Sequence, residues 1–388
     1  MTRGGWAADV TGTRVLVDAV AASSGGGAVR VAELARTLPG YRPLTRFTFV
    51  ARGEVRDRLR ATNTNLSVLS PPRSLSGVPL RLAWEHVALP RLAHRDLRPD
   101  VVLAPFNVAP LWWPGAIPPT VVIVSNLAPY SREVRRLYRG TELARLHLLR
   151  ALTDATLAKA RRVFLLSEQA FDLIDDRLLH GKAELLPMAP PPVPAVVSPE
   201  ESLPAHGYLL VAGDLLRYKG IETAIRALAL LPRSQQLPLA IAGRALDRPY
   251  VRQLRRLADA AGVAHLLVHL GPVGHERLLG LMRRSLACVV PSRFENPSRV
   301  PVEAMASGAP LLVSDIPVFR ATCGDAAVFF EVDRAEHLAY SIARLLNEPC
   351  MGDDLRSRGR RHLATLHVGS ASERIGQAID EIADGASG

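Results

Sequence analysis

Apolar residues come in short runs along the whole chain, and these runs alternate with stretches of helical periodicity. Short apolar runs rich in β-branched residues are typical of buried strands. In the first half the runs are 14–20, 47–50, 66–69, 101–104, 120–124, 162–166 and 183–186. In the second half they are 208–213, 239–243, 267–273, 286–290 and 310–313. Because predicted strands alternate with predicted helices, the pattern indicates parallel crossover units and an α/β fold rather than a β-sandwich.

A proline-dense segment separates the two sets of apolar runs. Residues 187–204 have the sequence PMAPPPVPAVVSPEESLP. Proline cannot continue a helix or a central strand, so this segment is typical of an extended linker. A chain of 388 residues also exceeds one ordinary domain. We therefore predict a first domain over 1–190, a linker over 191–205, a second domain over 206–365 and a C-terminal helix within 366–388, where Ile375, Ala378, Ile379 and Ile382 have helical spacing.

The composition is that of a globular protein. Apolar residues make up 48% of the chain and charged residues 22%, which is enough to fill two sizeable cores. We expect only the first dozen residues and the last few to lack fixed structure. No apolar run reaches the length of a membrane span, and no segment resembles a signal peptide. The three cysteines, Cys288, Cys323 and Cys350, lack metal-ligand spacing and fit reduced thiols of a cytoplasmic protein.

The net charge of +11 is concentrated in the first half of the chain. Residues 1–190 hold 26 Lys and Arg against 16 Asp and Glu, whereas residues 191–388 hold 22 against 21. Arginines and leucines alternate between 132 and 150, which predicts a basic amphipathic helix. Such a helix suits an anionic membrane surface or a phosphorylated acceptor, and an evenly solvated basic surface is the alternative. Because no aromatic residues interleave and no nucleic-acid module is recognisable, we do not expect nucleic acid as a partner.

The candidate chemistry centres on residues 291–315, PSRFENPSRVPVEAMASGAPLLVSD. Two carboxylates, Glu295 and Glu303, lie between apolar runs, and the small residues after Glu303 predict the start of a helix. In a strand, loop, helix and strand unit, the helix N-terminus faces the ligand crevice of a parallel sheet and offers N–H groups to an anion. The carboxylates would accept hydrogen bonds from sugar hydroxyls. The alternative is that Glu303 only complements the helix dipole and Glu295 is a solvated loop acid.

This stretch resembles the E-x7-E signature of retaining glycosyltransferases, specifically glycosyltransferase family 4, the group 1 glycosyltransferases. The flanking segments 290–292, 303–310 and 324–327 agree with that pattern, and the resemblance extends over 209–348. It implies the GT-B fold, in which two Rossmann-like domains with parallel sheets face a central cleft. It further implies that the first domain binds the acceptor, the second binds the nucleotide sugar, and the last helix packs back on the first domain. Glu295 would lie near the donor sugar and Glu303 would hold the ribose.

A second candidate group lies after the first strand of the second domain. Lys219 stands beside Gly220 at the start of a predicted helix containing 222–231, where it would meet a diphosphate, although a solvated lysine at a turn is the alternative. The family carries an Arg-Lys pair that clamps the donor phosphates, and Lys219 matches its second member. Asp214, after Gly213, stands where the arginine usually is. We expect Arg217 to supply the missing positive charge.

Other donor-side residues follow from the resemblance. In the family, backbone just past a strand-ending glycine contacts the nucleotide base, which would place Val273 near it. The family has an aromatic-glycine pair where this chain has Pro297 and Ser298. Because proline has no N–H, any phosphate contact would fall on Ser298, Arg299 or Val300.

In the first domain, the chain carries a glycine-rich segment after the first predicted strand. We predict that Gly25, Gly26 and Gly27 form a turn before a helix over about 28–38 and let the backbone approach a ligand. A flexible loop is the alternative. A similar turn in the family lies beside the donor diphosphate and the acceptor.

Ser125 and Asn126 follow the run 120–124 on the expected acceptor side. Many family members have a histidine where this chain has Ser125. A retaining front-face mechanism, in which the leaving phosphate takes the acceptor proton, does not need a protein base. Capping of the next helix by these two residues is the alternative. The histidines have no metal-ligand spacing, so we expect no metal.

Together these features predict a retaining, metal-independent hexosyltransferase without a cofactor. The expected donor is a nucleotide-diphosphate sugar, with UDP or GDP as the carrier, and the expected acceptor is a glycan, a lipid-linked sugar or a small molecule. We expect it in the cytoplasm, with the inner face of the membrane as a peripheral location. The departures at Asp214 and Ser125 leave a catalytically silent nucleotide-sugar-binding or scaffold protein as the alternative. An epimerase or a phosphorylase is a further alternative, but no pyridoxal lysine site is identifiable and the E-x7-E signature favours the transferase.

Overall fold

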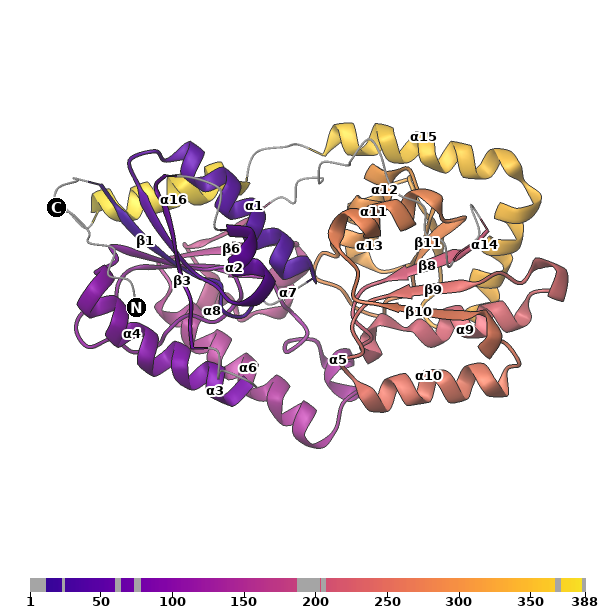
Figure 1. Ribbon diagram of the computed structural model, residues 1–388, viewed down its shortest axis with the longest axis horizontal. Coiled ribbons are helices and arrows are strands. Elements are labelled where there is room, and N and C mark those ends of the chain that lie inside the picture. Colours follow the sequence, from indigo (N-terminus) through magenta and orange to yellow (C-terminus); the bar gives the residue numbers. More distant parts are fainter. Residues whose placement is uncertain are drawn as a thin grey trace.

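The chain forms two α/β domains side by side (Figure 1). The computed structural model describes residues 12–22, 25–59, 64–72, 78–186, 203, 207–366 and 371–385. The predictions for the first eleven residues, for most of the linker and for the last three residues fall outside the described residues. Within them, no helix is long and apolar enough to cross a membrane.

The first domain is built on a parallel sheet of seven strands in the order β3-β2-β1-β4-β5-β6-β7. Its strands are β1 (Arg14–Asp18), β2 (Arg46–Val50), β3 (Leu66–Leu69), β4 (Val101–Ala104), β5 (Thr120–Val124), β6 (Arg162–Leu165) and β7 (Ala183–Leu185). Its α-helices are α1 (Gly25–Tyr41), α2 (Gly53–Leu59), α3 (Val78–Ala83), α4 (Leu89–Leu92), α5 (Arg132–Arg136), α6 (Gly140–Lys159), α7 (Gln169–Leu173) and α8 (Asp176–Leu179). Two π-helical turns, η1 (Trp84–Ala88) and η2 (Ala93–Leu97), flank α4.

The second domain repeats this plan with six parallel strands in the order β10-β9-β8-β11-β12-β13. They are β8 (Leu209–Ala212), β9 (Leu239–Ala242), β10 (Leu267–Gly271), β11 (Ala287–Val290), β12 (Leu311–Ser314) and β13 (Val328–Phe330). The helices are α9 (Ile221–Leu230), α10 (Arg248–Ala260), α11 (His275–Arg284), α12 (Arg299–Ser307), α13 (Pro317–Cys323), α14 (Ala335–Asn347) and α15 (Pro349–Thr365). Short 3-10 turns are η3 (Arg217–Lys219), η4 (Arg233–Gln235) and η5 (Ala264–Leu266).

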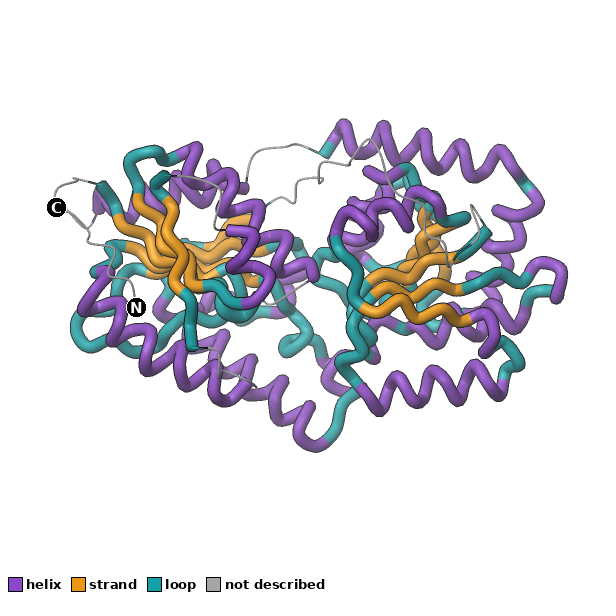
Figure 2. Tube along the Cα trace, viewed as in Figure 1, coloured by secondary structure: helices purple, strands orange, loops and turns teal. Residues whose placement is uncertain are grey.

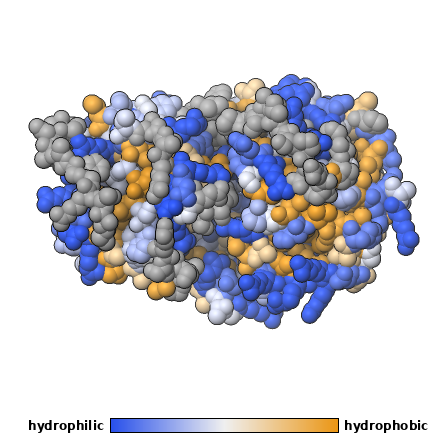
Figure 3. All heavy atoms as spheres, in the orientation of Figure 1, coloured by the Kyte–Doolittle hydropathy of each residue, from blue (hydrophilic) through white to orange (hydrophobic). Residues whose placement is uncertain are grey.

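Helices cover both faces of each sheet (Figure 2), which explains why most strands are apolar on both sides. The covering helices are amphipathic. In α10, Tyr250, Leu254 and Ala258 are buried at a spacing of four residues, whereas Arg252 and Arg255 are exposed. Figure 3 shows hydrophilic side chains along the lower edge of the second domain, where α10 lies.

The predicted strands agree with the observed ones to within a few residues, and the α/β prediction is confirmed. The pattern missed β13, because a three-residue edge strand is too short to show a period. One helix prediction is wrong: the basic stretch 132–150 is divided between α5 and α6. The helix breaks before Gly140, whose φ of 57° lies in the left-handed region that glycine accepts.

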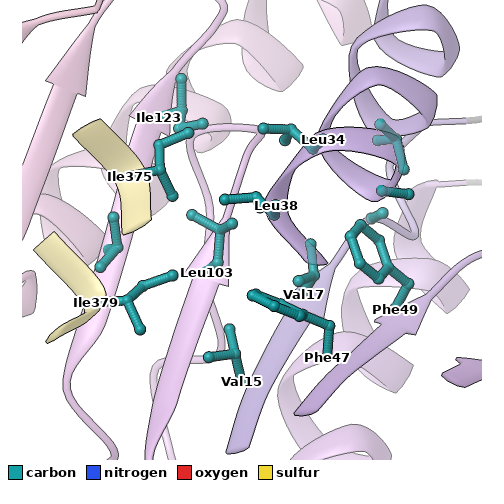
Figure 4. Close-up of a cluster of buried hydrophobic side chains, with 14 of the residues drawn as sticks. Val15, Val17, Leu34, Leu38, Phe47, Phe49, Leu103, Ile123, Ile375 and Ile379 are labelled. Carbon is teal, nitrogen blue, oxygen red and sulfur yellow. The ribbon is translucent and has the colours of Figure 1, made fainter. Parts of the chain in front are cut away.

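The C-terminal helix α16 (Ala371–Gly385) leaves the second domain and packs on the first. Ile375 and Ile379, both fully buried, lie in one cluster with Val15 and Leu103 of the first sheet (Figure 4). Leu34 and Leu38 of α1 flank them in the same view. Helix α16 therefore contributes to the core of the first domain.

The domains meet at the carboxyl ends of their strands. Phe294, in the loop after β11, and Tyr218 pack into an apolar cluster of the first domain that includes Leu127 and Leu146. The side chain of Asn296 donates to the carbonyl of Val124 at 3.2 Å and accepts from the Ser167 hydroxyl at 2.9 Å. Strand order reverses beside β1 and beside β8, and ligands of open α/β sheets bind in the crevices outside such points. The site residues are therefore sought on this interdomain face.

Candidate functional site

The helix of the two-carboxylate motif begins earlier than the sequence suggests. Ser298 is the N-cap of α12, and its side chain accepts from the Val300 N–H. Glu303 was predicted at the helix start, but it lies in the second turn and is 4% exposed. Ser298 sets the start of α12, because a serine side chain binds the N–H groups at a helix N-terminus. The prediction rested instead on the small residues that follow Glu303. At the other end, Gly308 has φ 73° and forms a left-handed C-cap.

Lys219 and Glu295 form a buried ion pair at the heart of this face. Lys219 Nζ lies 2.6 Å from Glu295 Oε1, and their side chains are 17% and 7% exposed. The Ser292 hydroxyl also donates to Glu295 Oε1, at 2.7 Å. A lysine from the end of β8 and a glutamate from the end of β11 thus meet although they are far apart in sequence. The alternatives of a solvated lysine and a solvated acid are wrong.

Glycines hold the Lys219 turn against the neighbouring loops. Gly220 has φ 61°, and a Cβ at this position would overlap the carbonyl oxygen of Pro291. A Cβ at Gly243 would overlap the carbonyl oxygen of Gly213 in the same way. These close approaches need glycine, because any side chain would force the loops apart. They bring Lys219 beside the loop that carries Glu295.

Glu303 lies in a mixed-charge cluster that spans both domains. Arg299 Nε donates to Glu303 at 3.2 Å, and a terminal nitrogen of the same guanidinium contacts Glu33 of α1 at 3.3 Å. His275 Nδ1 lies 3.8 Å from Glu303. Burial lowers the pKa of His275, the nearby arginines Arg299 and Arg58 lower it further, and Glu303 opposes them. Arg299 therefore places a positive charge beside the Glu303 carboxylate.

The predicted substitute for the missing arginine is engaged elsewhere. Arg217 donates to Asp247 at 3.0 Å and to Gln253 at 3.1 Å, so its charge is already paired. Asp214 is held by both ends of the Arg244 guanidinium, at 2.9 and 2.5 Å. That Arg217 faces the donor phosphates stays a prediction, with Asp247 and Gln253 as the partners seen here.

The glycine segment of the first domain is helical, which corrects the predicted turn. Helix α1 begins at Gly25, so Gly25, Gly26 and Gly27 form its first turn. Glycine accepts helical as well as turn backbone, and only tertiary packing distinguishes the two. A Cβ at Gly26 would lie 3.9 Å from Arg299 Cδ, which places the start of α1 against the start of α12.

On the acceptor side, Ser125 and Asn126 are fixed by Asn107. Asn107 Oδ1 accepts from both backbone N–H groups at 2.9 Å, and its amide donates to the Asn126 carbonyl at 2.9 Å. Asn107 has φ 65°, a left-handed conformation that asparagine tolerates. The alternative of helix capping is wrong, because Ser131 caps α5. Asn126 closes a local turn instead, since its Oδ1 accepts from the Ala128 N–H.

Two acidic side chains are buried in the first domain, one at the end of β1 and one in η1. Asp18, at the end of β1, and Glu85, in the π-helical turn η1, are 5% and 7% exposed. Burial raises the pKa of Asp18 to about 6 and, together with the Asp18 charge, that of Glu85 to about 8, while Arg81 opposes both shifts. Glu85 is therefore protonated near neutral pH, whereas Asp18 loses its proton near pH 6.

The remaining predicted residues lie just after strands of the second domain. Val273 is partly buried in the loop between β10 and α11, two residues before His275. Gly213 directly follows β8 and has φ 123°. Within the described parts of the chain, no group of three or more His, Cys, Asp or Glu side chains could hold a metal ion.

Sequence reasoning missed several site residues. Arg244 follows a strand-ending glycine exactly as Asp214 does, and that parallel could have revealed it. Asn107 and Asn296 gave no signal, because their roles depend on contacts between distant segments. His275 gave none either, since one histidine at a helix start is unremarkable.

Comparisons with known proteins agree with this architecture. Residues 201–362 match the family model described as "Glycosyl transferases group 1". A D-inositol 3-phosphate glycosyltransferase from Xylanimonas cellulosilytica is 30% identical over 244 residues, which cover 58% of this chain and 54% of that protein. The alignment thus spans about half the length of this relative.

Solved structures match over nearly the whole chain. Sucrose-phosphate synthase from Thermosynechococcus elongatus superposes with a TM-score of 0.72 at 18% identity, covering 97% of this chain and 100% of the other. Anabaena Alr3699/HepE, solved in complex with UDP and glucose, superposes with a TM-score of 0.68 at 16% identity, covering 95% and 99%. The predicted GT-B fold and the resemblance to group 1 glycosyltransferases are confirmed.

Proposed function

We propose that this chain, a GT-B protein that resembles the group 1 glycosyltransferases over residues 201–362, transfers a hexose from a nucleotide-diphosphate sugar to an acceptor hydroxyl. The product would belong to a glycan, a polysaccharide or a glycolipid. The observation that carries the proposal is the buried Lys219–Glu295 pair, which lies in front of α12, the helix that carries the buried Glu303. Buried charged groups of this kind are costly, and they cluster at functional sites.

Lys219 is proposed to stabilise the diphosphate. An ammonium has three N–H donors, so Lys219 can keep its bond to Glu295 and still donate to a phosphate oxygen. Negative charge grows on that oxygen as the bond between the sugar C1 and the phosphate breaks. A donor fixed there in advance stabilises the transition state more than the ground state.

The two carboxylates are proposed to orient the donor. Glu295 would accept from hexose hydroxyls, and Glu303 would accept from the ribose hydroxyls. Each carboxylate oxygen accepts more than one hydrogen bond, so the existing bonds of Glu295 to Lys219 and Ser292 leave capacity for the sugar. Ser298, Arg299 and Val300 at the start of α12 would face the phosphates.

Transfer is proposed to proceed with retention and without a metal. The acceptor oxygen would bond to C1 on the face that the phosphate leaves, and the acceptor proton would pass to the departing phosphate oxygen. Ser125 and Asn126 offer no basic side chain, and this mechanism needs none. They would line the acceptor side, fixed by Asn107.

The donor is proposed to be a UDP- or GDP-sugar. Alr3699/HepE was solved with UDP and glucose, which makes UDP-glucose a reasonable first candidate. The loop containing Val273 would contact the base through its backbone. We expect no cofactor.

The acceptor is proposed to be a glycan, a lipid-linked sugar or a small molecule. The exposed arginines Arg132, Arg136 and Arg139 near the α5–α6 junction would favour a phosphorylated acceptor or peripheral contact with the anionic inner face of the membrane. We expect a cytoplasmic location.

Thermal unfolding against UDP, GDP, ADP and their common sugars tests the donor site. A ligand at about a hundredfold over its dissociation constant should add roughly 2.7 kcal/mol to stability. The shift should vanish in Glu303→Ala and persist in the control Glu336→Ala, an exposed residue of α14. If no nucleotide shifts the wild type, the proposal is wrong.

A catalytically silent nucleotide-sugar-binding protein is the second candidate, because Asp214 replaces the expected arginine and is itself neutralised by Arg244. Such a protein would bind donor but release no nucleoside diphosphate when acceptors are added. Measured turnover with any acceptor would reject it.

A further inference from the structure

In the second domain, three cations close to the candidate site have carboxylate partners. Lys219 is paired with Glu295, Arg217 with Asp247 and Arg244 with Asp214. A diphosphate needs several charge-assisted donors, because its oxygens share about two negative charges. A further cation beside the diphosphate would make up for the one that Asp214 replaces.

Arg30, on the second turn of α1, is an unusual arginine of the first domain. Its Nη1 is shielded from solvent and has no hydrogen-bond partner among the described residues. Burial and the neighbouring Arg299 guanidinium lower the pKa of Arg30 to about 10, against the pull of Glu33, so it stays charged at neutral pH. A buried donor without a partner is rare, and a missing ligand is one physical explanation.

The surroundings of Arg30 suit an anion. The first turn of α1, at Gly26, lies against Arg299 in the first turn of α12. Two helix starts therefore meet here, where helix dipoles favour an anion, and an arginine belongs to each helix. Arg299 is 10% exposed and already reaches across to Glu33.

We infer that Arg30 binds the donor diphosphate from the first domain, together with Arg299, and replaces the cation that is absent at Asp214. This inference rests on the proposed function. The donor would then be held by cations of both domains, and the diphosphate would compete with Glu33 for Arg299. Donor binding would in this way tie α1 to α12.

Isothermal titration of the full chain with UDP and with uridine tests the inference, with GDP and guanosine as the second pair. Losing one hydrogen bond between charged groups should weaken UDP binding about tenfold to hundredfold in Arg30→Gln. Uridine affinity should not change, because uridine has no phosphate. Arg30→Lys should recover part of the UDP affinity. Arg36→Gln, an exposed arginine of the same helix, is the matched control and should bind like the wild type.

The outcomes separate two kinds of failure. A wild type that binds neither UDP nor GDP rejects the proposed function itself. A wild type that binds UDP, with Arg30→Gln equal to Arg36→Gln, rejects only the role of Arg30. Equal losses for UDP and uridine in Arg30→Gln also reject it, because they indicate a change of fold rather than a lost phosphate contact.

Discussion

The two domains share one architecture but carry their polar groups in different ways. In the second domain, partners lie close in sequence or at neighbouring strand ends: Ser292 with Glu295, Arg299 with Glu303, Lys219 with Glu295. In the first domain, Asn107 holds Ser125 and Asn126 from another segment, and Nη1 of Arg30 has no hydrogen-bond partner among the described residues. Residues that share a motif can be recognised from sequence, whereas residues brought together from scattered segments cannot.

The two domains also differ in how they match known proteins. The family model matches only residues 201–362. The fold likeness nevertheless covers almost the whole chain. The first domain therefore shares the known architecture, whereas the family model covers only the second domain and its approach.

The largest effect is expected at Gly243 in the second domain, where the chain leaves no room for a side chain. Gly243→Ala should destabilise the protein by more than about 4 kcal/mol, because the new Cβ would overlap the Gly213 carbonyl and push β8 and β9 apart. Thermal or urea unfolding measures this. Gly40→Ala in the first domain is the control: no heavy atom lies within 4 Å of the added Cβ, so stability should hold or rise. Equal melting of Gly243→Ala and wild type would contradict the packing.

The matching test of the first domain removes its C-terminal anchor. Ile379→Ala should cost about 2–5 kcal/mol, because the side chain is fully buried between α16 and the first sheet. Gln377→Ala, exposed on the same helix, should change stability by less than about 0.5 kcal/mol. Hydrogen exchange should show the loss of protection in the first domain, and a loss confined to the second domain would refute the assignment.

Loss of the buried ammonium tests the preassembled site. Lys219→Ala should reduce turnover by roughly 10² or more, because it removes a transition-state donor. It also leaves Glu295 without its cation, so the melting temperature must be measured alongside. Lys159→Ala is the control, since this lysine donates to the Leu111 carbonyl in the first domain. Unchanged turnover in a folded Lys219→Ala protein would exclude the proposed role.

The smallest effect concerns the buried acids of the first domain. The pKa values of Asp18 and Glu85 are raised to about 6 and 8, so the folded state holds their protons more tightly than the unfolded chain does. Their contribution to stability is complete in acid and is lost as the pH rises through 6 and then 8. Melting from pH 5 to 9 should therefore show Glu85→Gln gaining on wild type with rising pH.

Glu336→Gln, an exposed acid of the second domain, should show no such trend. A constant difference between Glu85→Gln and wild type across this pH range would mean that Glu85 is ionised throughout.

The strands and the position of the linker were predicted from apolar runs and from proline, which are local features of the sequence. Residues such as Glu295 and Glu303 were identified because their segment carries a distinctive spacing. The contacts of the predicted substitute Arg217 have a tertiary cause: Asp247 and Gln253 engage it from the start of α10. Nothing in the local sequence of Arg217 indicates that contact.

The α/β architecture, the order of strands and helices along the chain and the two acids of the motif could be predicted, because periodicity and spacing are properties of neighbouring residues. Tertiary packing sets which charges pair, that α1 begins at Gly25, that α16 returns to the first domain and that the start of α1 lies against Arg299. These outcomes depend on the packing of segments far apart in the chain, and burial there sets both the pairing and the cost of each charge.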